Sequence, residues 1–297
     1  MSLTSRYATV VPLLRRPRSG LLLGAAAVYL FALGVTGAVF VGTRGGQELD
    51  GRLLPPEYGG TYQQDTPLVE PAREILSLFG NTRHLVVLLG LVVAVAALTG
   101  RWWAGVAGVG VFVGSIAAAT VLKEVIGRPD LGVESSSTHN SFASGHAAAA
   151  MALLCAGLLL VPARARWWLA IPGVTGVSAI ASATMILGWH RLSDVIGGTL
   201  LASALCCLAA AVLVRQRGVA RPHDGSVWLK GVLLLVATPL PTLVAALALP
   251  AADGLVTAIV VAGVVTALAV VPVVVILAGV EFAPGTDRRV GVDRPAL

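Results

Sequence analysis

Residues 102–122 read WWAGVAGVGVFVGSIAAATVL, twenty-one positions without a charged side chain. A run of about 20 apolar residues is long enough to cross the hydrocarbon core of a bilayer as a helix. Across the whole chain 56% of residues are hydrophobic and only 12% are charged, which is far from the composition of a soluble domain. The sequence therefore indicates an integral membrane protein.

Eight apolar stretches of this kind are separated by short polar or Gly/Pro-containing breaks. Each should be helical, since a backbone surrounded by lipid must satisfy its own hydrogen bonds. The predicted fold class is all-α, a polytopic bundle of membrane helices. The first stretch is longer than the apolar core of a secretory signal, which favours a retained helix. The stretches cover residues 20–42, 84–100, 102–122, 144–162, 167–188, 194–214, 229–249 and 255–279.

The distribution of Lys and Arg predicts how the bundle is oriented, because these residues stay preferentially on the cytoplasmic side. With both termini in the cytoplasm, 14 of the 21 Lys and Arg residues fall on that side. The predicted location is thus the plasma membrane, with both termini inside. The net charge of +6 reflects this topology and anionic lipid headgroups, and no basic patch with interleaved aromatic residues indicates a nucleic-acid partner.

The breaks divide the chain into segments. Residues 1–19 form a cytoplasmic N-terminal segment, 20–214 the main bundle, 215–228 a cytoplasmic linker, 229–279 two additional membrane helices, and 280–297 a cytoplasmic tail. An outer loop, 43–83, contains a predicted amphipathic helix over 71–79 that ends at Gly80-Asn81. Two interpretations of this loop stay open, a solvated connection and a lid over a site.

The small residues inside the spans are best explained by helix packing. The three cysteines all lie within predicted spans, where a small apolar role is the usual one. Four glycines of the third span could be mistaken for a dinucleotide fingerprint, but no strand precedes them, so close helix packing explains them better. They are Gly105, Gly108, Gly110 and Gly114.

Polar chemistry gathers first at the ends of the third and fourth spans. Lys123 and Arg128 follow the third span, and Ser144-Gly145-His146 opens the fourth. A Ser-Gly pair at a helix start presents a hydroxyl and backbone N–H groups at the positive end of the helix dipole, which suits a phosphate. Taken alone, each feature also has an ordinary interpretation, a snorkelling cation in the first case and a helix cap in the second.

A third polar block lies between the fifth and sixth spans and reads GWHRLSD over residues 188–194. If the sixth helix begins near His190, the four-residue spacing places His190 and Asp194 on one face, where the carboxylate can orient the imidazole. Ser193 could serve as a helix cap. The charge-based topology puts all three blocks at one membrane face, and ionisable residues near the membrane are functional candidates.

Together these blocks resemble the type 2 phosphatidic acid phosphatase (PAP2) superfamily, whose motifs are KxxxxxxRP, PSGH and SRxxxxxHxxxD. The resemblance covers residues 123–194 and implies a six-helix core over most of 20–214; the two additional transmembrane helices predicted over 229–279 lie outside that core. In that family the histidine matching His190 attacks phosphorus, the aspartate matching Asp194 supports it, and the histidine matching His146 protonates the leaving group. The family's phosphate-binding positions correspond here to Lys123, Ser144 and Gly145, and Arg128, two residues before the family's arginine position, could reach the same phosphate oxygens.

Three positions depart from these motifs. Asp130-Leu131 stands where the first motif has Arg-Pro, with Arg128-Pro129 two residues earlier; Ala143 replaces the Pro of the second motif; and Ala183-Thr184 replaces the Ser-Arg of the third. Arg191 is the only nearby basic residue that could replace the missing phosphate-binding arginine. The alternative is that Arg191 contacts lipid headgroups at the interface.

The resemblance implies hydrolysis of a lipid phosphate or polyprenyl (pyro)phosphate at the extracytoplasmic face, through a phosphohistidine and without a metal or other cofactor. The two nearby cations would repel a divalent ion, which disfavours a metal site built from the histidines. The implied partners are the lipid substrate and membrane lipids, and the last two spans could serve packing, lipid access or homo-oligomerisation.

Two other functions remain open. One is a lipid phosphotransferase of the same fold, in which a hydroxyl of another molecule takes the phosphoryl group. The other is a non-catalytic membrane protein or transporter with a decayed site, an idea suggested by the missing arginine. Within the outer loop after Arg128, His139 could contact substrate or act as a substitute acid.

Overall fold

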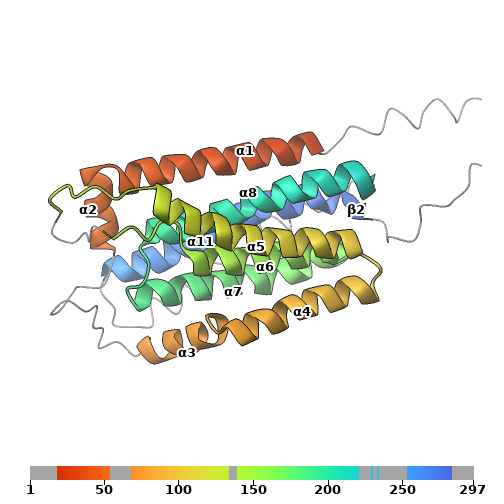
Figure 1. Cartoon of the computed structure of the whole chain (residues 1–297), viewed down its shortest axis with the longest axis horizontal. Coiled ribbons are helices and arrows are strands. Elements are labelled where there is room, and N and C mark those ends of the chain that lie inside the picture. Colours follow the sequence, from red (N-terminus) through yellow and green to blue (C-terminus); the bar gives the residue numbers. More distant parts are fainter. Residues whose placement is uncertain are drawn as a thin grey trace, which may run out of the picture.

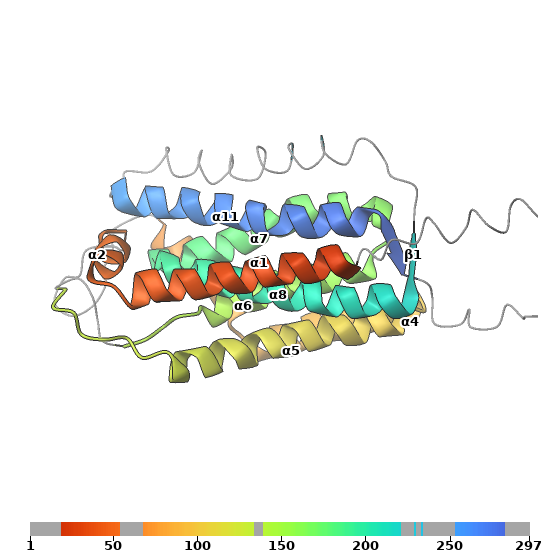
Figure 2. The ribbon, with the colours of Figure 1, turned by 90° about the horizontal axis from the view of Figure 1, so that it is seen from above.

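The computed structural model of the chain describes residues 19–53, 68–133, 139–220 and 253–282, together with positions 229 and 233. Within these residues the architecture is a bundle of long helices that run along one direction in both views (Figures 1 and 2). The predicted all-α fold class is confirmed. The long helices are α1 (Ser19–Thr36), α4 (Thr82–Leu98), α5 (Trp102–Val125), α6 (Gly145–Leu160), α7 (Arg166–Ile186), α8 (Leu192–Arg217) and α11 (Asp253–Ala278).

The apolar stretches of the sequence predicted these helices. Seven of the eight predicted spans coincide with a long helix, and their ends agree to within three residues when the π-helical turn Gly37–Val41 is counted with α1. The remaining predicted span, 229–249, lies outside the described residues apart from two positions. Five described helices are long and apolar enough to cross a membrane, and α3 (Val69–Phe79) with α4 makes a sixth unit that is bent by 57°. The chain is thus a multi-pass helical membrane protein.

The outer faces of the bundle are apolar. Phe31 on α1 is 74% exposed and Leu98 on α4 is 88% exposed, and other large aliphatic side chains line the same helices. A water-soluble protein would bury such side chains, whereas a hydrocarbon environment solvates them.

The interior of the bundle is occupied by α6, which packs against α5, α7 and α8. Of its 16 residues, mostly Ala and Leu, 12 are buried. Glycines on α5 allow close approach: a Cβ at Gly108 would lie 2.8 Å from the Cβ of Ala156, and one at Gly105 would lie 2.4 Å from the Cβ of Ala96. Two of the four glycines predicted to serve close packing therefore do so, and the other two do not.

A buried arginine joins helix ends at the end of the bundle away from α2 (Arg44–Arg52). Arg166 is fully buried and donates to the carbonyl oxygens of Leu158, Leu277 and Val280. The first two carbonyls belong to the last turns of α6 and α11, where backbone oxygens lack helical partners and a cation is favourable. One side chain therefore ties α7 to two other helices.

The same end carries a two-stranded sheet that the sequence did not predict. Strand β1 (Gly218–Ala220) pairs antiparallel with β2 (Val280–Phe282), although these segments were assigned to a linker and a tail. Within β2, Glu281 forms an ion pair with Arg101 at 2.6 Å and accepts a hydrogen bond from the N–H of Ala163. Pairing two segments far apart in sequence needs tertiary contacts that local patterns do not reveal.

The outer loop contains two short helices, α2 and α3. The predicted helix over 71–79 is confirmed as α3, which buries Ala72 and Leu76 in a cluster with side chains of α7. The helix α2 was not predicted. It lies across the end of the bundle (Figures 1 and 2) and begins after Thr43, whose hydroxyl accepts the N–H of Gly46 at 3.1 Å.

Candidate active site

The three polar blocks of the sequence meet at one end of the bundle. Helices α5 and α7 end there and α6 and α8 begin there, at the same end as α2 (Figures 1 and 2). The amide of Asn140 joins the first two blocks, since its Nδ2 donates to the carbonyl oxygens of Ile126 at 2.6 Å and Lys123 at 3.3 Å. The predicted clustering of the blocks is confirmed as an arrangement of the bundle.

Ser144 is the N-cap of α6, as predicted. Its hydroxyl accepts the N–H of Ala147 at 3.3 Å, and its own N–H donates to the backbone oxygen of Asp194 at 2.8 Å. A Cβ at Gly198 would lie 2.4 Å from the Ser144 carbonyl oxygen, so a glycine is required where α8 meets this turn. The N–H groups of Gly145 and the residue after it open the helix and have no acceptor within it.

His190 lies in a tight turn between α7 and α8. Gly188 has a φ of +67°, a left-handed conformation that favours glycine, and the N–H groups of Trp189 and His190 donate to the carbonyl oxygen of Thr184. Helix α8 begins at Leu192, two residues after His190, so His190 lies just ahead of the helix. The turn reverses the chain and holds the imidazole ahead of the helix.

The side chain of Asp194 nevertheless reaches His190. It is fully buried, and its Oδ2 lies 3.6 Å from the Nδ1 of His190. The same oxygen accepts the Ser141 hydroxyl at 2.6 Å and the N–H of Arg191 at 2.9 Å. A carboxylate three residues into a helix that accepts the N-cap N–H is half of a capping box. Local capping and the link to the second block thus fix one carboxylate beside the imidazole.

The two histidines of the blocks face each other. The ring centroids of His146 and His190 are 5.8 Å apart, with the planes at 60°. Trp189 also lies 5.8 Å from His146, centroid to centroid. His190 is buried to 8% exposure, and His146 is half-buried at the start of α6. The rings are close enough for one small substituent on His190 to contact both.

Three cations accompany the histidines. Lys123 lies in the last turn of α5, is half-exposed, and its charge acts on His146. Arg128 is buried in the segment that follows α5. Arg191 is also buried, and its Nη1 donates to the Ser141 hydroxyl at 3.1 Å. Arg191 therefore joins the hydrogen-bonded group around Asp194.

A family model described as PAP2 superfamily matches residues 107–218. This segment belongs to the PAP2 superfamily. It runs from within α5 through all three polar blocks to the end of α8. No curated protein and no solved structure matches the chain. The PAP2 resemblance read from the sequence is confirmed for residues 107–218, and this segment lies within the multi-pass helical bundle.

The departures from the PAP2 motifs have structural explanations. Thr184 stands where the motif has arginine; it is fully buried and its carbonyl oxygen anchors the turn before His190. Asp130 stands where the first motif has arginine, and its Oδ1 accepts the N–H of Gly132 at 3.0 Å, so it stabilises a turn. Ala143 replaces the motif's proline and is fully buried. Asp130 and Thr184 thus make local hydrogen bonds with their side chains, and Ala143 is part of the buried core.

Asp50 is a site residue that the sequence reasoning missed, and it lies outside the PAP2 match. It is fully buried on α2 and accepts both the N–H of Ser193, at 3.1 Å, and the Ser193 hydroxyl. The sequence allowed Ser193 to serve as the cap of α8. Instead, its N–H and hydroxyl are bound by Asp50, which belongs to another element. Burial, together with the charge of Asp194, raises the pKa of Asp50 to about 6.

A weak signal for this contact exists in the sequence. Gln47 and Asp50 are three residues apart and both are buried on one face of α2. The Gln47 Nε2 donates to the carbonyl oxygens of Val41 at 2.9 Å and Pro129 at 3.0 Å. Two polar residues at helical spacing after a Thr cap predict a short helix, but their partners are visible only in three dimensions.

The outer loop borders the site at a second point. A Cβ at Gly80, in the break between α3 and α4, would lie 3.6 Å from the Nε2 of His146. With α2 bound to Ser193, the described parts of 43–83 thus contact the site region at two points, and the interpretation as a solvated connection without a catalytic part stays open. Closure as a lid remains a prediction.

The structure describes two other histidines. His139 is exposed, and the Nδ1 of His84 lies 2.8 Å from the carbonyl oxygen of Leu78 at the α3–α4 break. His223 lies outside the described residues. Among the residues that the structure describes, no group of three or more His, Cys, Asp or Glu side chains is placed to hold a metal ion. The three cysteines are buried and free.

Proposed function

We propose that the chain hydrolyses a lipid phosphate or polyprenyl (pyro)phosphate at the extracytoplasmic face, through a phosphohistidine on His190. The observation that carries this proposal is the paired arrangement of His190 with the buried Asp194 on one side and His146 on the other. A carboxylate at Nδ1 selects the tautomer that leaves Nε2 free as a nucleophile, and a second imidazole can transfer a proton.

The reaction would proceed in two displacements. In the first, Nε2 of His190 bonds to phosphorus while the bond from phosphorus to the leaving oxygen breaks, and His146 gives that oxygen a proton. In the second, His146 takes a proton from water, whose oxygen attacks phosphorus and displaces His190 as inorganic phosphate leaves. Asp194 stabilises the cationic imidazole in both steps, and its 3.6 Å separation from Nδ1 is expected to shorten when substrate binds.

The phosphate dianion needs positive charge and N–H donors before a nucleophile can approach. We assign this role to Lys123, Arg128 and Arg191 and to the start of α6 at Ser144-Gly145. A Cβ at Gly145 would meet open space, so a phosphate oxygen can approach the backbone there. Since the Ser144 hydroxyl already caps the helix, it acts through the helix start, and Arg191 also orients Ser141.

The test is phosphate release by the purified protein in detergent. Phosphatidic acid, phosphatidylglycerol phosphate, a polyprenyl pyrophosphate and a polyprenyl phosphosugar would be compared. We expect release from at least one of them in excess EDTA, and inhibition by vanadate, which adopts the five-coordinate geometry of the transition state. Loss of activity in EDTA that a divalent ion restores would contradict the mechanism. Phosphate recovered on an added alcohol instead of in solution would indicate a phosphotransferase.

A further inference from the structure

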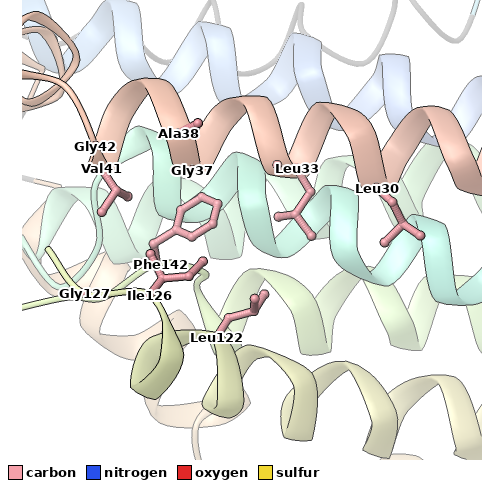
Figure 3. A pocket seen from close by; sticks show the side chains of 11 residues that line it. Leu30, Leu33, Gly37, Ala38, Val41, Gly42, Leu122, Ile126, Gly127 and Phe142 are labelled. Carbon is pink, nitrogen blue, oxygen red and sulfur yellow. The ribbon is translucent and has the colours of Figure 1, made fainter.

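An apolar groove with a volume of about 370 Å³ lies between α1 and the end of α5 (Figure 3). Helix α1 and the π-helical turn Gly37–Val41 form one wall, and the last turn of α5 forms the other. None of the described residues that line it is charged. The side chains that give the groove its apolar surface are Leu30, Leu33, Val41, Leu122, Ile126 and Phe142.

The groove exists because α1 carries small residues on this face. Gly34, Gly37 and Ala38 line it, and a Cβ at Gly34 would meet nothing within 4 Å. The last turn of this segment is π-helical, a conformation that often marks functional positions. From Leu30 to Val41 the groove follows roughly 16 Å of helix.

One end of the groove adjoins the site. Its lining includes Phe142, which directly follows Ser141 and lies two residues before Ser144. It also includes Gly127, the neighbour of Arg128. The proposed phosphate-binding residues Arg128 and Ser144 therefore closely follow residues of the apolar lining in the sequence.

Phe142 is held firmly at this junction. A Cβ at Gly37 would lie 3.2 Å from its ring, and a Cβ at Gly197 on α8 would lie 2.5 Å from it. The ring is thus seated between Gly37 of the π-helical turn and Gly197 of α8.

We propose that the groove binds one hydrocarbon chain of the lipid whose phosphate occupies the site; this rests on the proposed function. An uncharged lining within the apolar part of α1 fits an acyl or prenyl chain and no polar ligand. The volume lies at the lower end of the range for ligand pockets, about 300–1,000 Å³, which fits one chain and not two. The groove would thereby select substrates by chain length.

The kinetic test uses substitutions that fill the groove with a larger side chain. Gly34→Leu adds a side chain where there is room for it, and Gly24→Leu makes the same change in open space elsewhere on α1. The kcat/KM for a long-chain lipid phosphate is divided by the kcat/KM for its short-chain form. Gly34→Leu should lower this long-chain to short-chain ratio by at least about tenfold. Gly24→Leu should keep the wild-type ratio. Ala38→Leu, also in the groove, replaces Gly34→Leu if that variant does not fold. An unchanged ratio in a folded groove variant would overturn the proposal.

A second measurement does not depend on turnover. Phosphatidic acid with a photoreactive group in its chain would be crosslinked to the full-length protein, with the matching diacylglycerol as the comparison. Crosslinks at Leu33 or Leu122 that require the phosphate and weaken in Gly34→Leu support the groove even if no lipid is hydrolysed. Crosslinks at other helices, or equal labelling by diacylglycerol, overturn it while leaving the hydrolase proposal in place.

Discussion

Asp194 is the side chain on which the hydrogen bonds of the site converge. Its Oδ2 is shared by Ser141, the backbone of Arg191 and, at a longer distance, His190. A fully buried carboxylate without donors would be costly, so these contacts hold its position strongly. This buried geometry is what allows Asp194 to orient the imidazole of His190.

The first prediction compares the loss of His190 with the loss of Asp194. His190→Ala should lower kcat by about 1,000-fold or more because it removes the nucleophile, and Asp194→Asn by a smaller factor of about 100-fold because it removes an orienting charge. Phosphate release measures both. The matched control is His84→Ala, which removes an exposed imidazole. A His190→Ala protein with the unfolding temperature and turnover of the wild type would show that the mechanism is wrong.

The second prediction concerns Asp50 and pH. Its pKa is about 6 in the folded protein against 3.8 ordinarily, so the folded state keeps a proton that the unfolded chain releases. The resulting stabilisation is complete below the ordinary pKa and is lost as the pH rises through 6. We expect wild type to lose about 2 kcal/mol relative to Asp50→Asn between about pH 4 and pH 7.

Thermal unfolding in detergent across this pH range would measure the difference between the two proteins. Glu48→Gln makes the same charge change at a partly exposed position on α2 and should show no such dependence. A wild-type-minus-Asp50→Asn difference that stays constant with pH would refute the assignment.

At the level of elements, the sequence predicted what depends on local patterns. Uninterrupted apolar runs located seven helices, and the Ser144 cap followed from residue type and position alone. The helix α2 was missed because two polar residues stabilise it through distant partners, Pro129 in one case and Ser193 in the other. The proximity of His190 and Asp194 was predicted on a helical face, but a Gly188 turn and a capping contact produce it.

The third prediction concerns Arg166, which binds the ends of α6 and α11. Arg166→Ala should destabilise the protein by about 2–4 kcal/mol, because buried carbonyl oxygens lose a charged donor. Arg164→Ala, two residues before Arg166 at an exposed position, should have little effect on stability. Unfolding temperatures in detergent compare the two. Equal temperatures would mean that α11 is held by its apolar contacts alone.

At the scale of the whole molecule, the bundle has one end that carries the site and one end that carries the sheet. The charge distribution predicts that the site end faces outward and the sheet end faces the cytoplasm. The buried native cysteines make this testable, because a label should react only with an added cysteine.

The fourth prediction is therefore one of labelling. Arg44→Cys, on α2 at the site end, should react with a membrane-impermeant maleimide in intact cells. Arg164→Cys, exposed at the opposite end, should react only after the cells are permeabilised. The reverse pattern would place the site in the cytoplasm and exclude an extracytoplasmic substrate.

The hydrogen bonds from Ser193 to Asp50 also set an order of assembly during synthesis. Asp50 leaves the ribosome 143 residues ahead of Ser193, so α2 has no donors for its carboxylate until α8 has been made. Because burying that carboxylate alone would be unfavourable, α2 should settle on the bundle only then. The earliest-made part of the site is thus the last to be fixed, and a nascent chain arrested before α8 emerges should have no phosphatase activity.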